Sequence, residues 1–258
     1  MARCIDLASS TTQLGATLHD DDDADPRCLP QRNTVKFFKD RHWTEREFPE
    51  LQSTGEKKVS GPASTNGKVD CRINWRCGVG NFVFPVLEAN PDMFIYCCDF
   101  SSRAIEFVKA NENYDESRCL AFVCDITQDP LTNTIPAASL DLLSSIFCLS
   151  AVPPQKLQDA VNNIGAVMKP GGLVMFRDYG LYDAAQLRFK PGHKIDDNFY
   201  VRQDGTFSVY FSIEQLKELF ENAGFEAIAI DYVEKEIVNR KRELSMQRRW
   251  IQAKFRKL

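Results

Sequence analysis

The sequence CGVGNFVFPVLEANPDMFIYCCD, residues 77–99, decides the fold. A glycine turn at Gly78 and Gly80 is followed by a helix-sized interval, an apolar strand-like run from Met93 to Cys98, and then Asp99. This is the layout of a nucleotide-binding α/β unit, in which the acid at the end of the second strand accepts hydrogen bonds from ribose hydroxyls. The segment therefore predicts a site for an adenosine-containing cofactor.

Strand and helix patterns alternate along the rest of the chain. Strands are expected at 69–75, 93–98, 119–126, 139–149 and 172–176, with helices at 82–88, 103–110 and 155–168 between them. Ser101 or Ser102 would cap the second helix, and Pro170-Gly171-Gly172 would close the third. After these come a hairpin around 202–206, a helix over 212–223, and last strands at 227–233 and 250–255. Such alternation predicts an α/β domain whose sheet is mostly parallel and covered on both faces.

Composition limits the size and the partners of this domain. A length of 258 residues with 43% hydrophobic residues suffices for one sizeable α/β domain plus an appendage. The net charge is -4, but the acids of the first thirty residues account for it, and the segment 235–258 carries nine bases against two acids. A basic end is compatible with a nucleic-acid partner, although a solvated surface is the commoner explanation of a charge cluster.

The N-terminal part divides into two segments before the domain. Residues 1–31 lack periodicity and include the acidic run 20–23, which predicts a disordered acidic tail. Residues 32–68 form a basic-aromatic arm and linker, and residues 69–258 form the domain itself. Aromatic side chains among bases can stack on and neutralise single-stranded nucleic acid. A helix that buries its aromatics on the core explains the arm's composition equally simply and is the interpretation favoured by composition alone.

Cysteine and histidine usage bears on metal and compartment. The nine cysteines form no C-x-x-C pair, several lie in apolar strand candidates, and none of the three histidines has a zinc-site spacing to a cysteine. No metal is predicted, and the thiols are expected to be reduced. The sequence contains no run near the ~18 apolar residues needed to span a bilayer, and its acidic start argues against a transit peptide. We expect no membrane association and a cytoplasmic location, with the nucleus as the alternative.

Three stretches carry a more specific resemblance. The sequences FFKDRHW at 37–43, FRDYGLYD at 176–183 and NFYVRQDGT at 198–206 closely resemble the methyltransferase-like family that makes 3-methylcytidine in tRNA anticodon loops. The similarity runs from about residue 33 to the C-terminus. It implies a class I, Rossmann-like methyltransferase fold with a mostly parallel seven-stranded sheet and helices on both faces. It also implies S-adenosylmethionine as cofactor, the tRNA anticodon stem-loop as partner, N3 of the cytidine at position 32 as target, and, for some relatives, a synthetase partner.

The resemblance assigns the cofactor residues. Gly78 and Gly80 would form the turn at the methionine end, with the amides of the following helix facing the carboxylate. Asp99 would bind the ribose hydroxyls, and Asp125 with the backbone of Ile126 would bind the adenine edge. Ile146 would lie along the sulfonium side. The alternatives are strand-end acids that cap turns for Asp99 and Asp125, and a plain core residue for Ile146.

The same resemblance assigns the substrate residues. The catalytic candidates are Asp178, Tyr179 and Tyr182, because a carboxylate and aromatic faces would stabilise the positive charge that methylation places on the cytosine ring. A purely structural turn explains these three about as well. The RNA-binding candidates are Lys36, Lys39, Arg41, Trp43, Arg188, Lys190 and Arg202, for each of which an ordinary surface role is the alternative.

The chain departs from the family in two places. Where the family has an acid and a first glycine before the turn, this sequence has Asn74 and Arg76. The family's upstream Trp-Asp-x-Phe-Tyr element has no counterpart in residues 1–31. These departures leave two further interpretations open: a catalytically impaired RNA-binding paralogue or a splice or gene-model variant, and, from another class, a small-molecule methyltransferase.

Overall fold

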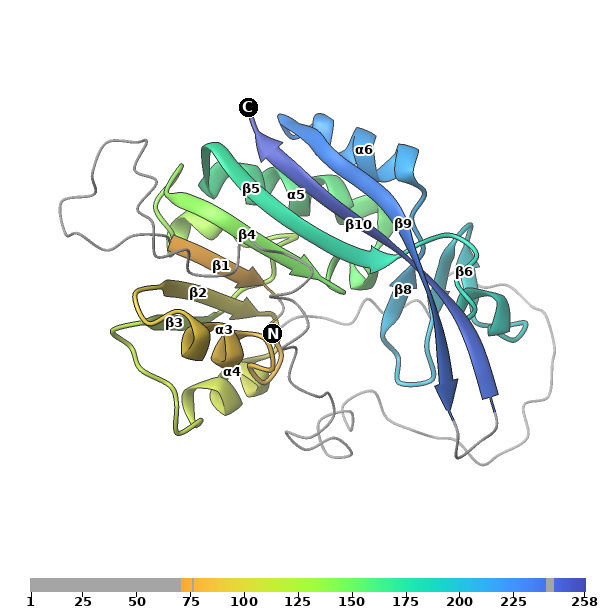
Figure 1. Ribbon diagram of the computed structural model, residues 1–258, viewed down its shortest axis with the longest axis horizontal. Helices are drawn as coiled ribbons and strands as arrows, with labels where there is room; N and C mark the ends of the chain where they lie inside the picture. The colour runs from red at the N-terminus through yellow and green to blue at the C-terminus, as the bar shows by residue number, and fades with distance from the viewer. Residues whose placement is uncertain (1–70, 76, 240–243) are drawn as a thin grey trace, which may run out of the picture.

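The protein is built on a seven-stranded mixed sheet (Figure 1). The computed structural model describes residues 71–75, 77–239 and 244–258. The strands are β1 (Cys71–Trp75), β2 (Phe94–Asp99), β3 (Cys119–Val123), β4 (Leu140–Ile146), β5 (Met168–Tyr179), β9 (Phe225–Asn239) and β10 (Leu244–Lys257). They lie in the order β3-β2-β1-β4-β5-β10-β9, with β10 antiparallel to both of its neighbours and the other pairs parallel. The predicted mostly parallel seven-stranded sheet is confirmed.

Helices cover both faces of the sheet, as predicted (Figure 1). They are α3 (Val83–Ala89), α4 (Ser102–Lys109), α5 (Leu157–Val167) and α6 (Ile213–Glu221), joined by the short 3-10 turns η4 (Leu131–Asn133), η5 (Leu149–Ala151), η6 (Pro154–Lys156) and η7 (Gln186–Arg188). Two apolar clusters form the core. One joins α3 and α4 to β2 through residues such as Val83, Ile95 and Ile105. The other joins α5 and α6 to β5 and β10 through residues such as Ile164 and Phe220.

Local sequence explains where most helices begin. Ser101 Oγ accepts a hydrogen bond from the Ala104 amide at 3.3 Å and caps α4, which selects Ser101 over Ser102. At α6, Ser212 and Gln215 form a reciprocal capping box, in which each side chain accepts from the other residue's amide. Such caps satisfy amides that the helix itself leaves without acceptors.

The expected end of α5 is wrong. The helix stops at Val167, and Met168 already has the extended backbone of β5 (φ -76°, ψ 136°). Residues 169–172 then bulge within the strand, because Leu140 pairs with Met168 while Leu142 pairs with Leu173. Pro170-Gly171-Gly172 therefore accommodates a break in strand register instead of closing the helix.

The last two strands are longer than the sequence predicts. β9 and β10 have 15 and 14 residues, where alternation predicts about half of each. Their charged halves pair with each other, and antiparallel hydrogen bonding needs no apolar side chains. In Figure 1 this pair runs beyond β5 toward the small sheet of β6 (Lys194–Asp196), β7 (Phe199–Val201) and β8 (Phe207–Val209). The predicted hairpin joins β7 to β8, where the Arg202 amide donates to Thr206 O at 2.8 Å.

Several predictions fall outside the described residues. These are the disordered tail at 1–31, the arm and linker at 32–68, the first two residues of the domain, and Arg76. The polar-apolar alternation of 69–75 is unusual for a central parallel strand, yet β1 lies between β2 and β4, parallel to both. In the described part of the chain, the helices are too short or too polar to cross a bilayer.

Candidate active site

The predicted cofactor residues meet at one edge of the sheet. β1, β2, β3 and β4 are parallel, so the glycine turn after β1, Asp99 at the end of β2, Asp125 after β3 and Ile146 at the end of β4 all lie at the carboxyl edge. Open parallel α/β sheets bind ligands at this edge, where neighbouring connections leave toward opposite faces. The topology therefore brings the sequence-predicted cofactor residues together.

The glycine turn needs both of its glycines, for different reasons. Gly78 has φ +54° and Gly80 has φ +92°, both in the left-handed region. A Cβ on Gly80 would overlap the ring of Phe84, which packs directly over the turn. A Cβ on Gly78 would meet no atom within 4 Å. Gly80 is thus required for packing, whereas Gly78 leaves an open backbone cradle that a side chain would fill.

Asp99 is tied to this turn. Its side chain is only 5% exposed. Oδ2 accepts a hydrogen bond from the Gly78 amide at 3.0 Å, and Oδ1 accepts one from the Ser101 amide at 3.0 Å. A carboxylate has about four lone-pair positions, so each oxygen keeps the capacity to accept one hydroxyl.

Asp125 is held as a carboxylate. Its Oδ1 accepts from the amide and the hydroxyl of Thr127 at 3.0 and 2.8 Å, and Oδ2 accepts from Gln128 Nε2 at 2.7 Å. Burial raises the pKa of Asp125, but the hydrogen bonds from Thr127 and Gln128 outweigh burial and hold the pKa below its ordinary value. The carbonyl of Ile126 accepts from Asn163 Nδ2 at 3.0 Å, which anchors this loop to α5.

These groups fit S-adenosylmethionine. The open cradle at Gly78 suits the close approach of the methionine end, and Asp99 offers acceptors for two hydroxyls. Asp125 Oδ2 can accept from the exocyclic amine of adenine. Ile146 is 2% exposed at the end of β4, where its backbone pairs with that of Arg177.

The three catalytic candidates have different surroundings. Asp178 is completely buried, and its carboxylate accepts from the amides of Ser150 and Tyr179, each at 2.9 Å. Tyr179 is partly buried at the end of β5. Tyr182 is 65% exposed with φ +66°. Its amide donates to Gln186 Oε1 at 2.6 Å.

Tyr179 lies at the centre of an aromatic and arginine cluster. Its ring centroid is 5.2 Å from that of Phe147 and 5.6 Å from that of Tyr210. The guanidinium carbons of Arg202 and Arg248 lie 5.2 and 5.7 Å from the Tyr179 centroid. These contacts join the ends of β4 and β5 to β10 and to the hairpin between β7 and β8.

Trp250 extends the cluster and was missed by sequence reasoning, as were Phe147 and Arg248. Its ring is 5.9 Å from that of Phe147, and Arg177 and Arg248 lie 5.6 and 5.4 Å from its centroid. The basic stretch around Arg248-Arg249-Trp250 was the only signal in the sequence. The pairing of Trp250 with Tyr179 across β10 and β5 makes the cluster, and a sequence does not reveal that register.

A buried ion pair fixes the corner after β5. Asp183 is 0% exposed and accepts from Arg248 Nε at 2.9 Å, from the Arg249 amide at 2.7 Å and from the Ala185 amide at 2.7 Å. Buried charges persist when they are paired and fully hydrogen-bonded. Asp183 therefore holds Arg248 in the orientation in which it faces Tyr179 and Trp250.

The RNA-binding candidates separate into three groups. Arg188 and Lys190 are exposed near η7, whereas Arg202 is partly buried over Tyr179 and donates to Ser208 Oγ at 3.1 Å. Lys36, Lys39, Arg41 and Trp43 lie outside the described residues. Within the basic C-terminal segment, Arg249 pairs with Glu234 and Arg256 with Glu226. Part of that positive charge therefore joins β10 to β9.

Comparisons with known proteins agree with this geometry. Residues 76–174 match the model of a methyltransferase domain. An S-adenosylmethionine-dependent methyltransferase from Anabaena variabilis superposes with a TM-score of 0.58 at 14% identity, covering 84% of this chain and 83% of that one. One from Methanosarcina mazei gives 0.57 at 17% identity, covering 74% and 93%. The fold and the site define a class I S-adenosylmethionine-dependent methyltransferase.

Sequence relatives narrow this class. The tRNA N(3)-cytidine methyltransferase METTL6 of Homo sapiens is 49% identical over 230 residues, which cover 88% of this chain and 77% of the relative. The tRNA N(3)-cytidine methyltransferase METTL2 of Danio rerio is 44% identical over 249 residues, covering 86% and 70%. The chain belongs to the tRNA N(3)-cytidine methyltransferase family.

Proposed function

We propose that this protein transfers a methyl group from S-adenosylmethionine to N3 of a cytidine in the anticodon loop of tRNA, at position 32. Relatives named as tRNA N(3)-cytidine methyltransferases at 42–49% identity support the substrate class. The observation that carries the proposal is the cluster around Tyr179, which places aromatic faces and arginines at the carboxyl edge of the sheet beside the cofactor residues.

The chain's role in this reaction is to bind and orient. The cofactor supplies an electrophilic methyl group on a sulfonium. Cytosine N3 has an in-plane lone pair and no proton at neutral pH, so it needs no strong general base. The protein must hold N3 about 3–3.5 Å from the methyl carbon and in line with the sulfur. Gly78, Asp99 and Asp125 would hold the two ends of the cofactor, and Ile146 would border the methyl group.

The target base must leave its stack to reach the site, because N3 is engaged in a duplex and buried among neighbours in a stacked loop. Tyr179, Phe147 and Trp250 offer flat faces on which a splayed base can stack. Arg202 and Arg248 beside these faces would attract the flanking phosphates. The aromatic faces would also stabilise the positive charge of the methylated ring.

The direct test measures methyl transfer to an anticodon stem-loop and digests the product to nucleosides. We expect 3-methylcytidine from the stem-loop with cytidine at position 32, and none from a matched stem-loop with uridine there. Incorporation into the uridine stem-loop, or into a small acceptor alone, would contradict the proposed substrate.

A second interpretation, an RNA-binding paralogue with impaired catalysis, is favoured by one observation. Arg76 and Asn74 stand where the family has a glycine and an acid. If these residues weaken the cofactor site, Arg76→Gly combined with Asn74→Glu should tighten S-adenosylhomocysteine binding in calorimetry. Wild-type binding and methyl transfer equal to those of the double variant would show that the departures are harmless.

Partner choice and location are proposed on weaker grounds. We propose that an aminoacyl-tRNA synthetase assists the selection of tRNA, since some relatives need such a partner. Methyl transfer to full-length tRNA with and without the cognate synthetase tests this, and equal rates would reject it. We also propose a cytoplasmic location, supported by the many apolar-strand cysteines typical of reducing compartments. Fractionation of cells that express the tagged chain would check it.

A further inference from the structure

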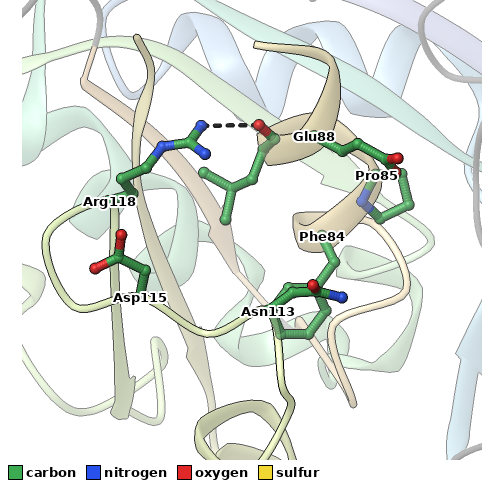
Figure 2. A pocket seen from close by; sticks show the side chains of 7 residues that line it. Phe84, Pro85, Glu88, Asn113, Asp115 and Arg118 are labelled. Atoms are coloured by element: carbon green, nitrogen blue, oxygen red, sulfur yellow. Dashed lines mark hydrogen bonds between the residues drawn. The ribbon is translucent and has the colours of Figure 1, made fainter. Parts of the chain in front are cut away.

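A second cavity lies between α3 and the loop that leads from α4 into β3 (Figure 2). It measures about 500 Å³ and is lined by Phe84, Pro85, Leu87, Glu88, Asn113, Asp115 and Arg118. The loop enters β3 at its start, so this cavity lies toward the amino edge of the sheet, whereas the cofactor residues lie at the carboxyl edge. Its volume is in the range of ligand sites.

The walls of the cavity are firmly held. Pro85 and Leu87 are buried parts of α3, and Phe84 packs partly against the core. Arg118 Nη2 donates to Leu87 O at 2.8 Å and to Asn90 O at 2.7 Å, which satisfies carbonyls at the end of α3. The bond to Leu87 is visible in Figure 2. The cavity is therefore preformed, and a guest would not have to pay for ordering it.

The mouth of the cavity is anionic. Glu88 and Asp115 contribute carboxylates, and Glu88 forms no ion pair with any residue in the described part of the chain. The Ser117 amide fixes Asp115 by donating to its Oδ1 at 2.8 Å. Exposed acids at Asp92, Glu112 and Glu116 surround the mouth. This corner repels phosphate and attracts cations, unlike the arginine-rich cluster at Tyr179.

The wall also carries a donor that lacks an acceptor. Arg118 Nε is buried and makes no hydrogen bond in the described structure. A buried donor without a partner costs free energy. A guest that carries a carbonyl as well as a positive charge would satisfy both features, and a peptide with a basic side chain is such a guest. A polyamine has the charge but no acceptor.

We propose that this cavity binds a basic segment of a partner protein. The alkyl stem of an arginine or lysine would lie on Phe84, Pro85 and Leu87, as long basic side chains do on apolar surfaces. Its charge would pair with Glu88 at the mouth, and a backbone carbonyl of the segment would accept from Arg118 Nε.

The cavity has a physical connection to the cofactor turn. Phe84 lines the cavity with its side chain and also packs over Gly80, so closely that no Cβ fits there. A guest that presses on Phe84 would therefore act on the turn. Binding of the segment is expected to change the affinity for S-adenosylhomocysteine, and the cofactor must change the affinity for the segment by the same factor.

The test titrates the full chain, labelled with nitrogen-15, with the acetylated and amidated peptide Leu-Arg-Leu. We expect saturable shifts of the Leu87, Glu88 and Arg118 amides that weaken with salt. Glu88→Gln should weaken binding by about fivefold, as for the loss of a partly shielded ion pair. Glu112→Gln is the matched control, because it removes the same charge from the neighbouring loop without touching the cavity, and it should bind as the wild type does.

Three outcomes would overturn the proposal. One is equal binding of the peptide Leu-Gln-Leu, and another is equal weakening by Glu112→Gln, which would indicate only a diffuse field. The third is spermidine binding as tightly as Leu-Arg-Leu, which would show that the site reads charge without a peptide. The amide shifts do not depend on methyl transfer, so this result stands or fails separately from the proposed function.

Discussion

Replacing Gly80 with alanine should destabilise the fold by about 2–5 kcal/mol. The left-handed backbone costs a non-glycine residue about 1–2 kcal/mol, and Gly80 has φ +92°. The added Cβ would overlap the Phe84 ring, and overpacking a well-packed site costs about 1–3 kcal/mol. The two costs act on the same residue and add.

Gly78→Ala is the matched comparison. Its φ of +54° carries a similar backbone cost, but a Cβ there meets no atom within 4 Å. Fewer conformations in the unfolded chain return about 0.4–1 kcal/mol, so the net loss of stability should be about 1 kcal/mol or less. Its Cβ fills the cradle instead, so S-adenosylhomocysteine affinity should fall at least about tenfold, the equivalent of 1.4 kcal/mol.

Urea denaturation and calorimetry separate the two effects. Phe84→Leu combined with Gly80→Ala should recover the overpacking part of the loss and leave the backbone part, giving a coupling energy of about 1–3 kcal/mol. A Gly80→Ala variant as stable as Gly78→Ala, or a cycle without coupling, would refute the packing of Phe84 over the turn.

Three further variants test the site. Asp99→Ala should abolish measurable S-adenosylhomocysteine binding in calorimetry, because two hydroxyl contacts to a charged acceptor, each about 1.5–3 kcal/mol, are lost; unchanged affinity would remove Asp99 from the site. Asp183→Asn should lower the free energy of unfolding by about 3–5 kcal/mol, since it leaves a buried arginine without its counter-charge; a urea midpoint like that of the wild type would count against this. Burial raises the pKa of Tyr210 to about 12, above the unfolded value of about 10, so its stabilising contribution is complete below pH ~10 and is lost as the pH rises toward 12. Tyr210→Phe should flatten this part of the stability profile, and an identical slope in both proteins would contradict the assignment.

The sequence alone determined the order of the elements and the cofactor edge. Gly78 and Gly80 mark a turn because other residues resist a left-handed backbone, and Asp99 and Asp125 each follow an apolar run that ends at the same edge of a parallel sheet. These signals are local: periodicity, caps and strand-end acids act over a few residues and survive in one dimension. The capping box at Ser212 was readable for the same reason.

Only the tertiary structure decided the substrate cluster and the lengths of the last strands. Trp250 meets Tyr179 through the register of β10 on β5, and Arg248 faces both rings because Asp183, 65 positions away in the chain, holds it. The charged halves of β9 and β10 are strands because each supplies the other's hydrogen-bonding partners. Such contacts join distant segments, and their energies depend on a register that no local pattern encodes.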